Sequence, residues 1–130
     1  MKLPKIALGI ITVTALLLSS CQKTVEDNLP GTWDISMTYS IMFPGQTFSE
    51  TPTGSANFDD DGTGEWTLDD ETQLLTWEYE DEKIRVISPY TDTFEDVTFD
   101  VIANEKDEQK WEGVHLTPEG SVNLFVELTK

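Results

Sequence analysis

The chain has 130 residues, with 25 acidic side chains against 8 basic ones and a formal net charge of −17. Nucleic acid is bound by basic surfaces, so this charge excludes a nucleic-acid-binding protein. The length suits one domain with a single modest hydrophobic core.

Residues 1–20 have the composition of a secretory signal peptide. Lys2 and Lys5 form a basic start, an apolar run of 13 residues covers 6–18, and two small serines follow. The run is too short to cross a bilayer as a helix, which takes roughly 20 residues. We expect residues 1–20 to be removed. This removes two of the eight basic residues and no acidic one, so 110 residues with a formal net charge of −19 remain.

Cys21 is the only cysteine, so it has no partner for an internal disulfide. Leu18-Ser19-Ser20-Cys21 resembles the lipobox of bacterial lipoproteins. The resemblance implies that the chain is cut before Cys21 and acylated there on both the thiol and the new amino terminus. Two or more acyl chains anchor a protein stably in a membrane. The alternative is an ordinary signal peptide followed by a chance cysteine.

Residues 21–28 are predicted to be the lipid anchor and a short polar tether. Gln22-Lys23 resembles the start of the signal that follows the cysteine in surface lipoproteins of Bacteroidetes, although the acids Glu26 and Asp27 come late. The resemblance implies attachment to the outer membrane of a bacterial envelope. The resemblance does not decide whether the protein faces the periplasm or the cell surface.

Residues 29–130 show the two-residue period of half-buried β-strands. Trp33, Met37 and Tyr39 alternate with polar residues, and the same alternation recurs in 75–80, 97–101 and 122–128. Residues 46–59 are less regular and predict an interrupted or edge strand. No segment after residue 20 has a helical period.

Turn signals separate these segments roughly every 8–12 residues. They lie at Pro44-Gly45, Asp59–Gly64, Asp69–Thr72, Asp81-Glu82, Pro89–Asp92, Asn104–Glu108 and Thr117–Gly120. We predict an all-β domain, an antiparallel meander of seven to nine strands with eight favoured. Sequential hairpins favour an up-and-down β-barrel, and a β-sandwich is the alternative.

Gly31-Thr32-Trp33 resembles the Gly-x-Trp motif that opens the lipocalin barrel. Together with the lipobox and the strand pattern, residues 29–130 resemble the small lipocalin-like lipoproteins of Bacteroidetes. The resemblance implies a lipocalin-like β-barrel that binds a small apolar ligand. Lipocalins place an arginine near the end of the barrel against this tryptophan; here Lys130 is the only nearby cation, and the domain is shorter.

The alternation places large side chains inside the barrel. This interior is either an aromatic pocket for a small apolar ligand or a packed core, and both interpretations stay open. The candidate ligand-binding residues are Trp33, Met37, Tyr39, Trp66, Trp77, Tyr79 and Phe99, with Trp111 as a further interior candidate.

No residue pattern predicts a metal site, a cofactor or a catalytic centre. Asp59–Gly62 fits a hairpin turn better than a calcium loop, whose flanking helices are absent. His115 is the single histidine, so no histidine pair exists for zinc or copper, and no serine stands in a Gly-x-Ser-x-Gly elbow. We therefore do not expect the protein to be an enzyme.

The leading functional hypothesis is non-catalytic binding of a small apolar ligand by a membrane-anchored barrel. The alternative is an accessory subunit that docks its acidic surface on an outer-membrane protein complex. An enzyme is a distant third.

Overall fold

A computed structural model of the chain describes residues 23–88, 95–118 and 120–130. The predictions for the signal peptide, for Cys21 and for the turn at 89–92 lie outside the described residues. Within those ranges the chain forms one short helix and nine strands. They are α2 (Val25–Asn28), β1 (Gly31–Phe43), β2 (Gln46–Glu50), β3 (Thr53–Phe58), β4 (Thr63–Leu68), β5 (Glu71–Glu80), β6 (Lys83–Ile87), β7 (Asp96–Asn104), β8 (Glu108–Thr117) and β9 (Gly120–Thr129).

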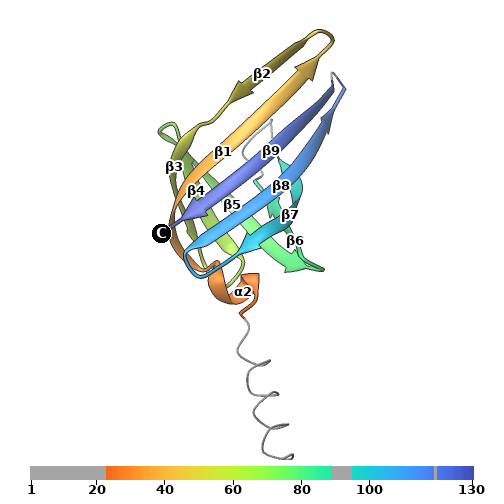
Figure 1. The fold of residues 1–130 in the computed structure, drawn as a ribbon. Coiled ribbons are helices and arrows are strands. Elements are labelled where there is room, and N and C mark those ends of the chain that lie inside the picture. Colours follow the sequence, from red (N-terminus) through yellow and green to blue (C-terminus); the bar gives the residue numbers. More distant parts are fainter. Residues whose placement is uncertain (1–22, 89–94, 119) are drawn as a thin grey trace, which may run out of the picture.

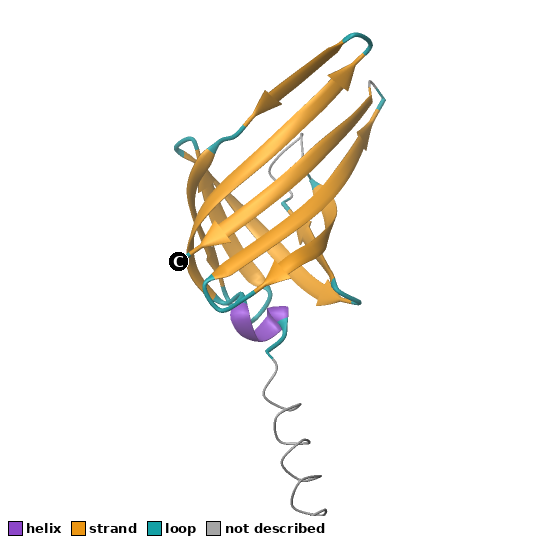
Figure 2. Cartoon of the chain, viewed as in Figure 1, coloured by secondary structure: helices purple, strands orange, loops and turns teal. Residues whose placement is uncertain are grey.

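The strands form a closed antiparallel barrel (Figures 1 and 2). Strands β3 to β9 pair in sequence order, and β1 pairs with both β3 and β9. This last pairing closes an eight-stranded barrel and leaves β2 as one additional strand on β1. The predicted all-β meander is confirmed, and closure through β1 and β9 decides for the barrel over the sandwich.

Strand β1 is 13 residues long and changes partner along its length. Residues 31–36 pair with β3, whereas residues 39–43 pair with β2. On its other edge, residues 34–41 pair with β9 throughout. The β1–β2 and β8–β9 hairpins therefore project past the end of the barrel, as Figure 1 shows. We call this the open end, and the end that carries α2 the closed end.

Tight turns connect the strands where the sequence predicted them. Asp69 and Asp70 link β4 to β5, and Asp81 and Glu82 link β5 to β6, all four with positive φ between 49° and 67°. Two consecutive residues of this conformation make the type I′ turn that suits the twist of a hairpin.

The irregular segment 46–59 contains two strands, β2 and β3, separated at Thr51 and Pro52. Gly54 lies where β3 packs closely on β4, because a Cβ at this position would stand 1.7 Å from the Thr67 carbonyl oxygen. A residue without a side chain is needed at this contact.

The closed end is sealed by the helix α2, which the sequence did not predict. Val25 and Leu29 lie four residues apart on one side of this helical turn, and both are buried. The Trp33 indole donates a hydrogen bond of 2.8 Å to the Leu29 carbonyl. Of the segment predicted as a tether, residues 25–28 are therefore folded against the barrel.

Asn104 fixes the chain before α2 to the barrel. Its side-chain oxygen accepts hydrogen bonds from Asn28 (3.0 Å) and from the fully buried Gln109 (2.6 Å), and its amide donates to the Lys23 carbonyl (3.3 Å). The first described residue is thus hydrogen-bonded to the β7–β8 turn at the closed end.

Large aromatic side chains fill the barrel above α2. Phe58 packs edge-on against Trp77 and Trp111, with ring centroids 6.4 and 5.9 Å apart. Lys130, the cation that follows the last strand, places its ammonium 4.4 Å from the centre of the Trp33 ring. This cation–π contact covers the ring from the end of β9.

Candidate functional site

The middle of the barrel holds no room for a ligand. A gap of only about 10 Å³ lies there, between Met37, Trp66, Val86, Val97, Phe99 and Leu124. A cavity of this size is at the lower limit for a single water molecule. Below the open end, the interior is therefore a packed core.

A pocket of about 470 Å³ opens above this core, at the open end. Pockets for small molecules usually fall between about 300 and 1,000 Å³, so the volume fits one small ligand. The pocket is lined by Met37, Tyr39, Ile41, Phe48, Pro52, Trp66, Leu68, Asp69, Glu71, Gln73 and Val122.

The pocket exists because the strands end at different heights. β3 begins at Thr53 and β4 ends at Leu68, whereas β1 and β9 continue into the projecting hairpins. Figure 2 shows this difference in length between the two sides of the barrel. The short side leaves an opening, and the long side supplies an apolar wall that includes Ile41 and Val122.

Trp66 and Met37 form the boundary between the pocket and the core, since both also line the small internal gap. Both side chains are buried. The Trp66 indole donates a hydrogen bond of 2.9 Å to the side-chain oxygen of Gln73, which lies opposite it on β5. The floor is therefore apolar, and its polar N–H group is already satisfied.

Tyr39 and Glu50 form a hydrogen-bonded pair on one side of the pocket. They are register partners on β1 and β2, and the phenol donates its hydrogen to the carboxylate. This hydrogen bond, followed by burial and the negative charge of Glu50, raises the pKa of Tyr39 above its ordinary value of 10.0. The phenol therefore stays protonated at any physiological pH.

The charged residues in the pocket lining are acidic. Asp69 lies in the β4–β5 turn, and Glu71 stands opposite Leu68 at the start of β5. Both side chains are exposed at the rim. No lysine or arginine of the described ranges lines the pocket.

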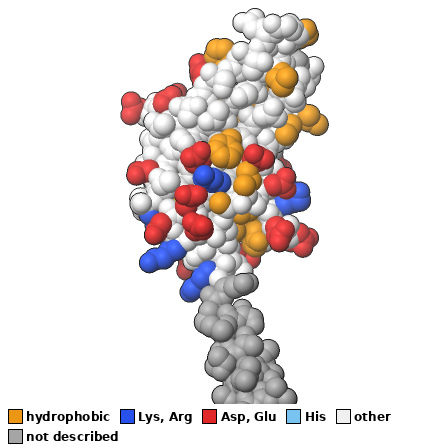
Figure 3. Space-filling model, in the orientation of Figure 1, with side chains coloured by type: hydrophobic (Ala, Val, Ile, Leu, Met, Phe, Trp, Pro, Cys, Tyr) orange, Lys and Arg blue, Asp and Glu red, His pale blue; other side chains and the backbone are white. Residues whose placement is uncertain are grey.

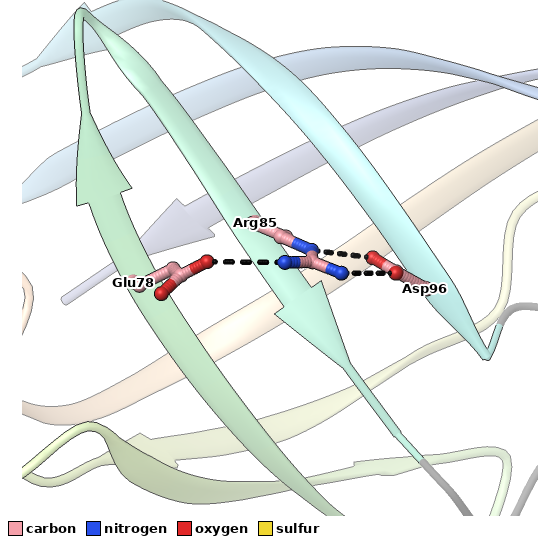
Figure 4. A network of polar contacts seen from close by, with 3 residues as sticks. All are labelled: Glu78, Arg85 and Asp96. Carbon is pink, nitrogen blue, oxygen red and sulfur yellow. Dashed lines mark hydrogen bonds and ion pairs between the residues drawn. The ribbon is translucent and has the colours of Figure 1, made fainter.

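The basic residues are instead held on the outer wall or at the closed end. Arg85 donates two hydrogen bonds, of 2.9 and 2.6 Å, to Asp96 and one of 3.4 Å to Glu78 (Figure 4). The hydrogen bonds from Arg85, together with its positive charge, lower the pKa of the Asp96 carboxyl. Lys83 pairs with Asp100 at 2.8 Å in the same way. These pairs join neighbouring strands, and because they are exposed, solvent screens their charges.

The interior residues named from the sequence fall into two groups. Met37, Tyr39 and Trp66 line the pocket. The others belong to the packed core or contact it: Trp33, Trp77, Phe99 and Trp111 are buried, and Tyr79 is partly buried against them. Gly31 and Trp33, the motif residues, lie at the closed end at the start of β1.

Other pocket residues were not recognised from the sequence. Phe48 and Pro52 come from the irregular segment 46–59, where no alternation indicated a face. Leu68 and Val122 belong to predicted strands, and the alternation of these strands indicated that both side chains point inward. It did not show how far along the barrel axis they lie.

The Asp59–Gly62 segment forms the predicted hairpin turn. The Gly62 amide donates to the Asp59 carbonyl (3.2 Å), and the Asp61 carboxylate accepts from both the amide and the hydroxyl of Thr63. These hydrogen bonds lower the pKa of Asp61. Among the described residues, no three His, Cys, Asp or Glu side chains are grouped to hold a metal ion.

Exposed apolar side chains gather on the two projecting hairpins. Met42, Phe43 and Phe48 lie on β1 and β2, and Val114 and Leu116 lie on β8. We call these five residues the hairpin apolar set. Residues 35–49, 113–118 and 120–126 contain no Asp, Glu, Lys or Arg. Figure 3 shows acidic side chains gathered over the barrel wall, with apolar side chains both among them and towards the open end.

No protein-family model and no curated protein matches the chain. Among solved structures, the chain is similar to a redesigned β-barrel with 18% sequence identity and a TM-score of 0.49. That match covers 82% of this chain and 94% of the other. Within the described ranges, no helix combines the length and apolar character needed to cross a membrane.

The Tyr39–Glu50 pair yields a prediction for alkaline pH. Because the folded-state pKa of Tyr39 is raised, its hydrogen bond stabilises the fold fully below the unfolded pKa of about 10 and is lost as pH rises through the raised value. Glu50→Gln removes the charge, so the pKa of Tyr39 should fall towards its ordinary value. Ultraviolet absorbance of tyrosinate measures this, and Tyr39→Phe identifies the transition. An unchanged titration in Glu50→Gln would contradict the pairing.

Proposed function

We propose that the protein is a lipid-anchored barrel that binds a small apolar ligand in the open-end pocket without catalysis. The observation that carries the proposal is the pocket of about 470 Å³ above a fully packed core, with a predominantly apolar lining. Gln73 accepts the hydrogen bond of Trp66 and Tyr39 donates one to Glu50, so below its acidic rim the pocket offers a ligand apolar contact.

The location proposed for the protein is the outer membrane of a bacterial cell, with acylated Cys21 as the anchor. The resemblance of Leu18–Cys21 to a lipobox supports it. Lys23 is hydrogen-bonded to the closed end, and Cys21 is two residues away, a span of at most about 7 Å. An anchor at Cys21 would thus hold the closed end against the bilayer and direct the pocket away from it.

Leu68→Trp tests ligand binding because Leu68 lies at the edge of the pocket and is only partly buried. A tryptophan there fills the pocket without entering the core. We expect decanol to change the fluorescence of Trp66 in the native chain, and its affinity to fall by about tenfold or more in Leu68→Trp by calorimetry.

Leu116→Trp is the matched control. Leu116 is 79% exposed and stands outside the pocket lining, so this variant should bind decanol as the native chain does. Absence of decanol binding up to its solubility limit, or equal binding by Leu68→Trp, would count against the pocket.

Cys21→Ser tests the anchor. The native chain should fractionate with membranes and show, by intact mass spectrometry, an acylated amino terminus at Cys21. Cys21→Ser should leave the membrane fraction, whereas Ser20→Ala, which keeps a small residue before the cut, should be processed normally. A native chain without acyl groups would refute the anchor.

A second candidate function is that of an accessory subunit in a membrane protein complex. The acidic wall was the surface expected from the sequence, but the hairpin apolar set is a more specific candidate, because its five exposed side chains lie on segments 35–49 and 113–118, which contain no Asp, Glu, Lys or Arg. It also lies at the end opposite to the proposed anchor.

Gentle extraction followed by native mass spectrometry tests this second function. A discrete larger assembly that is lost in Met42→Ser/Leu116→Ser would assign the contact to the hairpins, since neither residue lines the pocket. A contact through the acidic wall would instead weaken with added salt. A bare acylated monomer would exclude a stable complex.

A further inference from the structure

We propose that the open-end pocket selects amphiphiles with a cationic head group, such as alkyl amines, over carboxylates of the same chain length. This inference rests on the proposed function, because it names the ligand class of the same pocket. It follows from the position of the charges around the opening.

The pocket has one apolar part and one charged part. Met37, Trp66 and Val122 form its buried part, whereas the two carboxylates of the lining, Asp69 and Glu71, stand exposed at the rim. A ligand with its apolar body in the pocket would place its head group at this rim. The head group and the carboxylates would then meet at the border with solvent.

A third carboxylate contributes to the same region. Glu50 accepts the hydrogen bond of Tyr39, whose side chain lines the pocket. The negative charge of Asp69 also raises the pKa of Tyr39, which places Asp69 close enough to act on this phenol. Acids from β2, from the β4–β5 turn and from the start of β5 therefore surround one opening.

No described base offsets these charges. Lys83, Arg85 and Lys110 form ion pairs with acids of the barrel wall, and Lys130 stands over Trp33 at the closed end. The remaining described bases, Lys23 and Lys106, precede α2 and lie between β7 and β8, also at the closed end. None of the four ion pairs in the described ranges includes Asp69 or Glu71. The potential at the opening is therefore negative, in a chain whose total charge is −17.

Elementary electrostatics then separates ligands by head group. A cation at the rim is attracted by the carboxylates, and a carboxylate there is repelled by them. The aromatic side chains of Tyr39 and Phe48, which also line the pocket, add a cation–π attraction for an ammonium group. A neutral alcohol gains only the apolar contact and should bind with intermediate affinity.

The test compares decylamine, decanol and decanoate at neutral pH, where the amine is protonated and the acid ionised. The protein is the Cys21→Ser chain, because the buried apolar side chains of the described residues lie between Val25 and Leu128. Calorimetry should show decylamine binding about tenfold more tightly than decanoate. Added salt should reduce this difference in affinity, because it screens the exposed carboxylates at the rim.

Asp69→Asn/Glu71→Gln should reduce the difference in affinity between decylamine and decanoate to less than about threefold. Binding of decanol by this variant shows that its pocket is still formed. Asp81→Asn/Glu82→Gln is the matched control, since it removes two charges from the same type of turn at the closed end. In this control, the difference in affinity between decylamine and decanoate should be as large as in the parent chain.

Decanoate binding as tightly as decylamine would overturn this inference and leave the proposed function standing. A difference that persists in Asp69→Asn/Glu71→Gln would assign selectivity to the overall charge and overturn the role of the rim. Failure of all three compounds to bind would instead refute the proposed function itself.

Discussion

The pairing of β1 with β9 is the constraint on which the rest of the structure depends. Its register runs from Asp34 opposite Thr129 to Ile41 opposite Val122. Side chains alternate between faces with a period of two, so a slip by one residue would turn the interior face of β1 to solvent. The same pairing fixes the open end, because it continues beyond the point where β3 leaves β1. The Met37 amide bonds to the Pro52 carbonyl at that point.

Packing differs at the two ends because large side chains concentrate at one of them. At the closed end, Trp33, Trp77 and Trp111 meet Phe58 and Phe99, and each indole N–H has an acceptor. Buried aromatic rings with satisfied polar atoms are what a stable core requires. At the open end, the wall formed by β3, β4 and β5 stops early and leaves the pocket unfilled.

The strands could be predicted because each leaves a local signal. Alternation identified β1, β5, β7 and β9, and Asp or Gly residues marked the turns between them. Helix α2 leaves no comparable signal, since four residues are too few for a helical period, and its stability comes from burying Val25 and Leu29. The burial of Gln109 could not be predicted either. Its hydrogen-bond partner, Asn104 at the end of β7, comes close to it only through the β7–β8 hairpin.

The candidate site was predictable only in part. The sequence predicted that Met37, Tyr39 and Trp66 lie inside the barrel, and it predicted the same for Trp33 and Phe99. It did not show that the first three line the pocket whereas the other two belong to the packed core. That separation depends on the height of each residue in the barrel, which is set by interstrand register. Alternation gives the face of a residue and leaves its height open.

The total charge and the hairpin apolar set are complementary features of this fold. Strand β2 is an edge strand beside exposed Met42 and Phe43, and such an edge favours association between copies. A net charge of −17 opposes this association, because two copies of the chain repel each other. The apolar hairpins and the acidic barrel wall therefore act on self-association in opposite directions.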